Sequence, residues 1–259
     1  ADLNQAFTAG AYDDGGNAVY EVFRAGKRTH HWLLGHHAYL STPEYSNADQ
    51  VETMRTMLHT AAQLAERGKK VRHGNHHTRG MVALFEIAAT YREFAQSEEW
   101  LKLAIDGLTW HLENEINPDG FQFERTVHYH QSDIENFLRV WQLAKRGNIE
   151  LPEIYTTQFR KMFDALLILG QPDRKLPVLQ DDTDALHAEV NEMSGVMALG
   201  TILYNDSRYA YFVDEGVSPL FYWLLDEKEL RTLESTQPIA PDMGSAALEA
   251  TGYYVMRNG

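Results

Sequence analysis

Apolar residues recur at helical spacing in one stretch of this chain after another, and that periodicity constrains the fold more than any other feature. One such stretch carries Met81, Leu84, Phe85 and Ala88, which follow the i, i+3, i+4, i+7 pattern of a helix face. The same pattern recurs in 101–112, 134–141 and 159–167. Further helices are expected at 191–204 and 218–226, so most of the chain is predicted to be helical.

Turn-forming residues separate these stretches, at Gly147 and in 117–120, 170–172 and 238–241. Helices joined by short loops, without alternating strands, are typical of an all-α domain built from paired antiparallel helices. The first ~25 residues include a turn-rich run at 13–16 and are expected to form a loop that leads into the helices.

The end of the sequence differs from the helical part. Residues 252–257 are aromatic and β-branched in an alternating pattern, which predicts a strand. A strand at the very end of the sequence is expected to lack a partner, so we interpret it as the first strand of a further β domain. The predicted organisation is a helical domain over 1–245 and the start of a β domain over 246–259.

Composition excludes several classes of function. The 259 residues include 23 Lys and Arg against 37 Asp and Glu, a formal net charge of −14, which argues against a nucleic-acid partner. No apolar run approaches the ~20 residues of a membrane-spanning helix, so we expect no membrane partner. The lack of cysteine excludes disulfides, thiol nucleophiles and cysteine-ligated zinc, and it fits exported and cytosolic proteins alike.

Residues 67–79 form a basic island in this acidic chain, with five Lys or Arg and three His. Gly74 interrupts the local structure just before the Met81 stretch, so Asn75 and His76 are expected at a helix N-terminus. Asparagine is a favoured helix cap, and the backbone N–H groups at such an end attract anions. The simpler interpretation is a solvated loop with a capping asparagine.

Histidine is over-represented, with 11 of the 12 residues between His30 and His130. His73 and His77 have the i, i+4 spacing of helical zinc ligands, but the acidic residue of the corresponding metalloprotease motif is missing, so we expect no metal there. The run 27–32, followed by two more histidines at 36–37, is either a surface patch or an adventitious metal site.

A second cluster spans 119–130, where an Asp-Gly turn leads through an irregular or extended stretch to Tyr129, which is flanked by two histidines. Such a tyrosine is unusual for a core, because buried polar groups each need a partner. Packing of Tyr129 with a satisfied hydroxyl is an equally good interpretation. A further acidic run at 180–184 is more simply a helix-capping turn than a site.

Asn, His, Tyr and Arg with few convergent carboxylates suit a negatively charged substrate. A uronic-acid polysaccharide is cleaved by β-elimination once its C5 proton becomes acidic. An amide donor helped by histidine can stabilise the charge that develops on the uronate carboxylate. A base then removes the C5 proton, and a Tyr or His donates a proton to the glycosidic oxygen.

Other functions remain open on these residues. A glycoside hydrolase would use two carboxylic acids, for which Asp181, Asp182 and Glu124 are the candidates. A polysaccharide-binding module would use the aromatic and histidine side chains only to grip sugar. A histidine-rich metal binder would gain stability from its metal.

The order and spacing of these motifs resemble the heparinase II/III superfamily of polysaccharide lyases. Gly74-Asn75-His76 precedes a long apolar helix, and Asp119-Gly120-x-Gln122-x-Glu124 leads to Tyr129-His130. Val22-Phe23-Arg24 through Arg28, and the closing Gly252-Tyr253-Tyr254-x-x-Arg257-x-Gly259, match as well. The details are most similar to the heparinase III group of heparan-sulfate lyases, although this chain has His76-His77 where that group has one histidine.

The resemblance implies a fold and a set of roles. The fold is an incomplete (α/α) toroid followed by an antiparallel β-sandwich, with this chain truncated at both ends and possessing only the first strand of the sandwich. Asn75 and His76 would hold the uronate carboxylate, and Tyr129 would be the catalytic acid/base. Substrate-binding or supporting residues would be Arg28, His31, His77, Arg79, Glu124, Arg125, His130 and Asp181.

The resemblance also bears on partners and location. The partner is expected to be an acidic polysaccharide, heparan-sulfate-like or another uronan such as alginate. The chemistry would need no cofactor, and a structural divalent metal would belong to the missing β domain. A further histidine, a candidate base, would also lie beyond Gly259, so the fragment itself is expected to be inactive. The expected location is the periplasm or the exterior of a bacterium.

Overall fold

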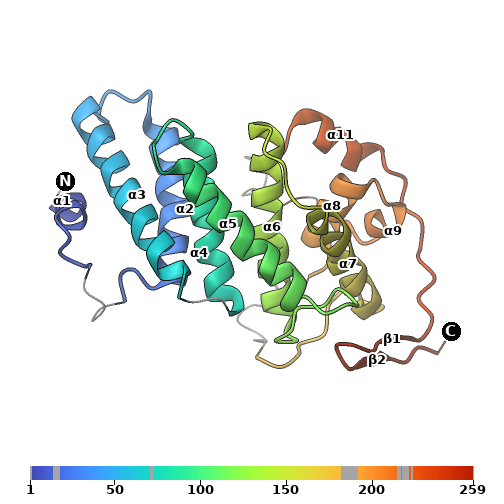
Figure 1. Cartoon of the computed structure of the whole chain (residues 1–259). Helices are drawn as coiled ribbons and strands as arrows, with labels where there is room; N and C mark the ends of the chain where they lie inside the picture. The colour runs from blue at the N-terminus through green and yellow to red at the C-terminus, as the bar shows by residue number, and fades with distance from the viewer. Residues whose placement is uncertain are drawn as a thin grey trace. The chain divides into compact units, whose positions relative to one another are not determined.

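The computed structural model describes residues 2–13, 18–70, 73–181, 192–214, 217, 222 and 224–258. The chain forms two compact units. The first unit comprises Ala1–His111 with Leu143–Leu151, and the second comprises Leu112–Gln142 with Pro152–Gly259. Helices dominate the described residues of both units (Figure 1).

The first unit is built on three long helices that lie side by side (Figure 1). These are α2 (Val22–Tyr39), α3 (Asn47–Gly68) and α4 (Gly74–Thr90). Helix α1 (Asp2–Thr8) packs on α3, and most of α5 (Ser97–Asn114) also belongs to this unit. The predicted apolar stripe forms the buried face of α4, since Met81, Leu84, Phe85 and Ala88 are fully buried.

Two glycines allow α2 and α4 to cross closely. A Cβ on Gly26 would lie 2.6 Å from the carbonyl oxygen of Arg79, and a Cβ on Gly80 would lie 2.9 Å from the Cβ of Val22. Farther along both helices, Nδ1 of His30 lies 2.9 Å from a carboxylate oxygen of Glu86. Phe23 lies against His76 and His30 against Glu86, so the contacts advance in the same direction along the two helices and α2 and α4 run parallel.

The expectation that the chain begins with a loop is wrong for residues 2–8, which form α1. Phe7 is 3% exposed and packs edge-on against Tyr20 and Trp32, with ring centroids 5.7 and 5.4 Å away. A helix this short has too few turns to show a periodic stripe, and the aromatic contacts of a single side chain hold it in place. Residues 14–17, which include part of the predicted turn, lie outside the described residues.

The second unit contains most of α6 (Val127–Gly147), together with α7 (Ile154–Leu169), α8 (Ser194–Tyr204), α9 (Ser207–Ala210) and α11 (Glu227–Ser235). Its core is aromatic, and the fully buried rings include Phe137, Tyr155, Phe159, Phe163 and Tyr209. The predicted helix at 191–204 is confirmed as α8, with residue 191 outside the described part. Of the helix expected at 218–226, residues 218–221 and 223 also lie outside it, and the next helix begins at Glu227.

The predicted terminal strand is confirmed, but the expectation that it lacks a partner is wrong. Strand β2 (Tyr253–Val255) pairs antiparallel with β1 (Ala246–Leu248), with Ala246 opposite Val255. Residues 246–248 are too few and too rich in alanine for the sequence to predict a strand there. Assignment of both strands to a separate β domain from residue 246 stays a prediction.

Asp119 fastens this hairpin to the second unit. Its two carboxylate oxygens accept hydrogen bonds from the backbone N–H and the hydroxyl of Thr251, at 2.8 and 2.6 Å. The Tyr253 hydroxyl donates to the carbonyl oxygen of Arg125 at 2.7 Å. The hairpin therefore braces 115–126, the segment that leads into α6.

We expect Gly120→Ala to lower the free energy of unfolding by about 2–4 kcal/mol. Gly120 has a φ of +93°, and a Cβ there would collide with the carbonyl group of Lys161. Urea titration of the variant measures the loss. The matched control is Gly244→Ala, whose added methyl group meets its nearest atom at 3.8 Å and should change stability by less than about 0.5 kcal/mol. Equal midpoints for the two variants would contradict the prediction.

Candidate functional site: the first turns of α4 and α6

The expectation that Asn75 and His76 lie at a helix N-terminus is confirmed. Helix α4 begins at Gly74, which has a φ of +76°, and the N-cap is His73. The capping role expected of Asn75 is wrong, because Asn75 lies inside the first turn, one position beyond Gly74. Asn75 is half-buried and His76 is exposed, so the first turn of α4 presents an amide and an imidazole together.

Residues that precede or begin α2 fix the imidazole of His76. The ring stacks on Phe23 with centroids 4.8 Å apart, and its Nδ1 lies 3.0 Å from Oε1 of Glu21. The same carboxylate is the N-cap of α2, accepting from the backbone N–H groups of Phe23 and Arg24. An ionised carboxylate only accepts hydrogen bonds, so Nδ1 of His76 carries the proton and Nε2 is left to meet a ligand.

Arg28, another predicted site residue of the first unit, packs against aromatic rings. The Arg28 guanidinium lies over the rings of Phe7 and Trp32, at 5.0 and 5.2 Å, and donates to the carbonyl oxygen of Val19. Burial lowers the pKa of Arg28 from its ordinary value. Arg28 thus has a structural part in this unit.

His77 is buried, at 2% exposed, and packs where α5 has Gly107 in place of a larger residue. Arg79 is half-buried with its guanidinium 5.9 Å from the Phe23 ring, which brings it close to the ring that stacks on His76. His31 is exposed on α2 and contacts the ring of His30.

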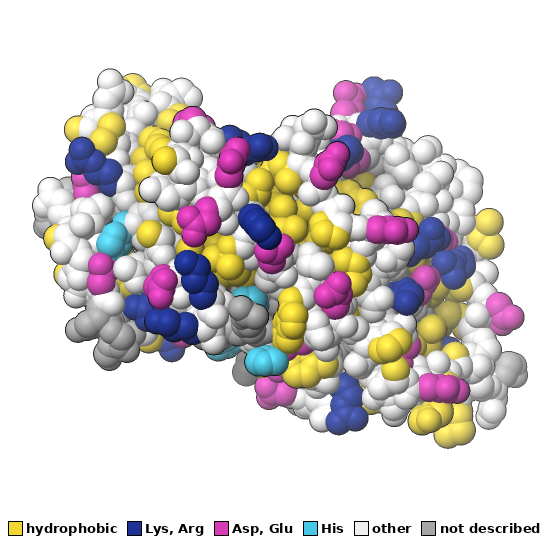
Figure 2. Space-filling view, in the orientation of Figure 1, with side chains coloured by type: hydrophobic (Ala, Val, Ile, Leu, Met, Phe, Trp, Pro, Cys, Tyr) yellow, Lys and Arg dark blue, Asp and Glu magenta, His cyan; other side chains and the backbone are white. Residues whose placement is uncertain are grey.

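Acidic neighbours partly neutralise the basic island at 67–79. Lys69 lies within 4.0 Å of carboxylate oxygens of both Glu66 and Glu99, and Lys70 lies 3.4 Å from Glu66. Acidic and basic side chains are interspersed over the face shown in Figure 2. Residues 71–72 fall outside the described part of the island. Within the described part of the island, Lys69 and Lys70 are therefore already in contact with carboxylates.

The second unit presents Tyr129 on the first turn of α6. Thr126 is placed to cap this helix, because its hydroxyl accepts the backbone N–H of Tyr129 at 2.9 Å. The Tyr129 hydroxyl donates to Oδ2 of Asp181 at 2.7 Å. This bond, burial, and the charges of Asp181 and Glu124 raise the pKa of Tyr129 to about 12, so the phenol is protonated at neutral pH.

His130 lies inside the second unit and is fully buried. Its Nδ1 accepts the backbone N–H of Gln122 at 3.1 Å, and its Nε2 lies 2.9 Å from the carbonyl oxygen of Met162. The ring stacks flat on Phe121 with centroids 4.4 Å apart. Burial lowers the pKa of His130 to about 4. His130 therefore supports the segment before Tyr129 from inside the protein.

The segment before Tyr129 is the irregular stretch that the sequence predicts, and its own side chains order it. The Gln122 amide donates to Glu124 at 3.0 Å and accepts the Glu124 backbone N–H at 2.8 Å. Arg125 is exposed and has a φ of +62°, a left-handed conformation that is uncommon outside glycine. These contacts set the direction in which α6 begins.

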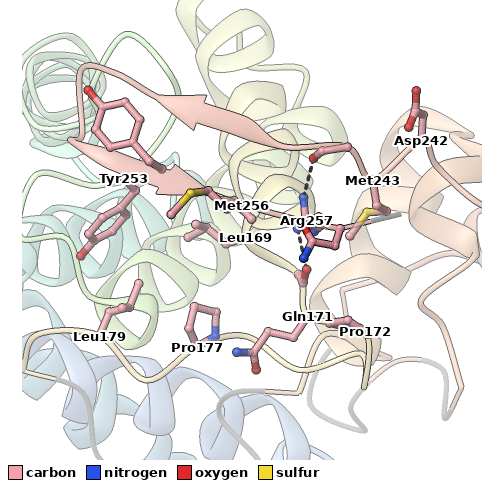
Figure 3. Close-up of a pocket in the computed structure, with 15 residues that line it drawn as sticks. Leu169, Gln171, Pro172, Pro177, Leu179, Asp242, Met243, Tyr253, Met256 and Arg257 are labelled. Carbon is pink, nitrogen blue, oxygen red and sulfur yellow. Dashed lines mark hydrogen bonds between the residues drawn. The ribbon is translucent and has the colours of Figure 1, made fainter.

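A cavity of about 890 Å³ lies beside the hairpin of the second unit (Figure 3). Its lining is mainly apolar, from Leu169, Pro172, Leu179, Met243 and Met256. Arg257 also lines it, but its guanidinium donates to the carbonyl oxygens of Ile168, Gly170 and Gly244. Asp181 and Tyr129 are not among the residues that line this cavity.

The structure thus groups the predicted residues in two sets. One set, in the first unit, joins His76, Phe23 and Arg79, and the other, in the second unit, joins Tyr129, Asp181 and the Glu124 charge. Asp182, a candidate acid of the hydrolase alternative, lies outside the described residues. Within the described ranges, no group of three or more His, Asp or Glu side chains is placed to hold a metal ion.

Sequence reasoning missed Glu21 and Thr126. Glu21 caps α2 and also contacts His76, whereas Thr126 caps α6, whose first turn carries Tyr129. Thr126 was detectable, because a threonine three positions before Tyr129 matches a helix N-cap. Glu21 gave no such signal for His76, since 55 positions separate the two residues.

Comparison with known proteins identifies the family. Residues 11–202 match the model of the heparinase II/III N-terminus. The chain belongs to the heparinase II/III family. Two relatives are heparin-sulfate lyases, one from Pedobacter heparinus, 26% identical over 190 residues, and one from Bacteroides thetaiotaomicron, 22% identical over 192 residues. The matches cover 72% and 68% of this chain, and the chain spans about a quarter of each relative, 25% and 24%.

Solved structures show the same fold. A crystal structure of a heparan sulfate lyase from Pedobacter heparinus matches 99% of this chain and 37% of its own chain, with a TM-score of 0.71 and 22% identity. The predicted fold class, an incomplete (α/α) toroid of paired helices, is thereby confirmed. Among the described helices, none is long and apolar enough to cross a bilayer.

We expect His76 to carry its proton on Nδ1 in its neutral form, and Glu21→Ala to abolish that preference by removing the acceptor. Nitrogen-15 spectra of histidine-labelled protein measure the tautomer, and His76→Gln assigns the signal. The matched control is His37, whose Nδ1 donates to the carbonyl oxygen of Leu33 at 2.8 Å and should be unaffected by Glu21→Ala. A His76 signal that is identical with and without Glu21 would show that the contact does not set the tautomer.

His130 should make the protein less stable in acid. Its pKa is about 4 when folded and ~6.5 when unfolded, so the unfolded chain binds more protons between these values. The free energy of unfolding should fall by about 2–3 kcal/mol from pH 7 to pH 4.5 through this group alone.

The contribution of His130 is measured by comparing urea midpoints at the two pH values in wild type and His130→Gln. The variant should lose less stability on acidification, although it is weaker at pH 7. His128→Gln removes an exposed histidine from the same turn of α6 and should keep the wild-type difference. An equal acid loss in wild type and His130→Gln would refute the assignment.

Proposed function

We propose that this heparinase II/III family member is a polysaccharide lyase that cleaves a uronic-acid polysaccharide of the heparan-sulfate or heparin type by β-elimination. Asn75 and His76 bind the uronate carboxylate, and Tyr129 is the catalytic acid and base. Arg79 adds positive charge near Phe23, the ring on which His76 stacks, and Arg125 is an exposed cation four positions before Tyr129. The observation that carries the proposal is Tyr129 on the first turn of α6, whose hydroxyl donates a hydrogen bond to the carboxylate of Asp181.

Each role follows from a contact of the residue concerned. The carboxylate of Glu21 binds Nδ1 of His76, so Nε2 is the ring nitrogen that can meet a ligand. When His76 is protonated, the N–H at Nε2 points away from Glu21 and can donate to the uronate carboxylate. Asn75 adds an amide donor in the same helical turn, where the helix dipole favours an anion. Stabilising the negative charge that develops on the carboxylate is the largest contribution an enzyme makes to this chemistry.

The relatives support the substrate class, since two that match over most of this chain are named heparin-sulfate lyases. We also propose that the chemistry uses no cofactor, because a carboxylate-binding pair and one tyrosine supply its requirements. A polymeric acidic substrate is met outside the cytoplasm, so the proposed location is the periplasm or the cell exterior.

The test follows the absorbance of the conjugated alkene that elimination creates at the new chain end. The chain and the complete product of its gene are each mixed with heparan sulfate, heparin, alginate and hyaluronan. Growth of absorbance with heparan sulfate or heparin supports the proposal, and growth with alginate alone would change the substrate class. Reducing ends without the alkene would refute elimination and direct attention to Asp181, Asp182 and Glu124 as hydrolytic acids.

Variants test the proposed roles. We expect Tyr129→Phe to lower kcat by ~10²–10⁴, the usual contribution of general acid–base catalysis. Asn75→Ala should lower kcat/KM by ~10²–10³ through loss of a charge-stabilising donor. Tyr254→Phe, at an exposed tyrosine on β2, is the matched control and should retain wild-type activity. Full activity of Tyr129→Phe would remove Tyr129 from the mechanism.

A further inference from the structure

The hydrogen bond between Tyr129 and Asp181 has a direction that limits what the phenol can do. Oη lies 2.7 Å from Oδ2 of Asp181. Because an ionised carboxylate only accepts, the phenolic proton lies between these two atoms. The lone pairs of Oη are then directed away from Asp181, so the neutral phenol faces its surroundings as an acceptor. A tyrosine in this state is arranged to receive a proton before it gives one.

We propose that Asp181 is a positioning residue that acts through Tyr129 as a proton relay, which lets the neutral phenol remove the C5 proton of a bound uronate. The inference rests on the proposed elimination and assigns the base of that reaction. It also separates Asp181 from the polysaccharide contacts to which the sequence assigned it.

The relay balances in protons and electrons. As the C5–H bond breaks, its proton passes to Oη while the proton of Oη passes to Oδ2 of Asp181. The electron pair left on C5 forms the C4–C5 double bond as the bond between C4 and the glycosidic oxygen breaks. Oη then gives its proton to that oxygen, and Asp181 returns its proton to Oη. The net change moves one proton from C5 to the leaving sugar and restores both side chains.

The surroundings of Tyr129 explain why such a relay is needed. The Asp181 bond, burial, and the charges of Asp181 and Glu124 keep the pKa of Tyr129 at about 12, so few molecules hold a phenolate at neutral pH. His128 is a further titratable neighbour, with its ring centroid 5.3 Å from that of Tyr129. Both carboxylates oppose a free phenolate, and only Asp181 is bonded to the hydroxyl and able to take its proton.

Asp181 can be changed without removing a part of the core. Its side chain is exposed, and the hydrogen bond to Tyr129 lies at the surface. Asp181→Asn preserves the shape and an oxygen that accepts the Tyr129 hydroxyl, but an amide cannot take up the proton. The matched control is Asp173→Asn, which removes the same charge from an exposed aspartate of the loop that leads to Asp181.

The first measurement is independent of activity. Ultraviolet titration of tyrosinate in the complete gene product, with the Tyr129→Phe spectrum subtracted, isolates the ionisation of Tyr129. In Asp181→Asn the midpoint should move from about 12 towards the ordinary value of ~10, and in Asp173→Asn it should not move. A midpoint that is unchanged in Asp181→Asn would overturn the pair itself.

The second measurement is kinetic, on the same proteins. In Asp181→Asn, kcat should fall ~10²–10⁴ with KM nearly unchanged, because orientation survives and the proton acceptor does not. In Asp181→Ala, added formate should restore part of the lost kcat by supplying a carboxylate in the exposed space. Wild-type kcat in Asp181→Asn, or no rescue by formate, would overturn the relay. If the wild-type protein forms no alkene from any uronan, both the proposed function and the relay are overturned. The ultraviolet titration would still show whether Asp181 is bonded to the Tyr129 hydroxyl.

Discussion

The close crossing of α2 and α4 is the constraint on which the first unit depends. Gly26 and Gly80 bring the two backbones nearly into contact, so the first turns of both helices share one neighbourhood. That proximity lets Glu21 serve as the cap of α2 and the hydrogen-bond partner of His76 on α4. A side chain at either glycine would separate the helices and detach the imidazole from its carboxylate, so backbone packing controls the chemistry of this site.

The second unit reaches a similar end by a different route. Asp119, Arg125 and Tyr253 tie the hairpin to the segment before α6, and Thr126 caps that helix. The fully buried His130 links the same segment to α7, because its ring binds the backbone N–H of Gln122 and the carbonyl oxygen of Met162. The residues around Tyr129 therefore hold its main chain on several sides, which leaves the side chain free to be set by one surface contact. A well-supported main chain that holds the Tyr129 hydroxyl in one place suits a group that must exchange protons.

The sequence was sufficient for the helices and for the first turns that carry Asn75 and Tyr129. Periodic apolar residues and a glycine before Asn75 determine these features locally, and local signals can be read without a structure. The sequence was insufficient for α1, for β1 and for the partner of His76. Phe7 secures α1 through tertiary contacts, β1 is defined only by pairing with β2, and Glu21 meets His76 because two distant glycines permit it. Contacts between residues far apart in the sequence produce no periodic pattern from which they could be predicted.

Arg257 shows how a residue distant in sequence completes the end of a helix. Helix α7 has no basic residue in its last turn, although the carbonyl groups there carry partial negative charge. The Arg257 guanidinium supplies that charge by binding the carbonyl oxygens of Ile168 and Gly170, across 89 and 87 positions of sequence. A nascent chain released only as far as β1 would have an α7 terminus without its cation. The end of α7 therefore depends on a contact between residues far apart in the sequence, which can form only once the segment beyond β1 is in place.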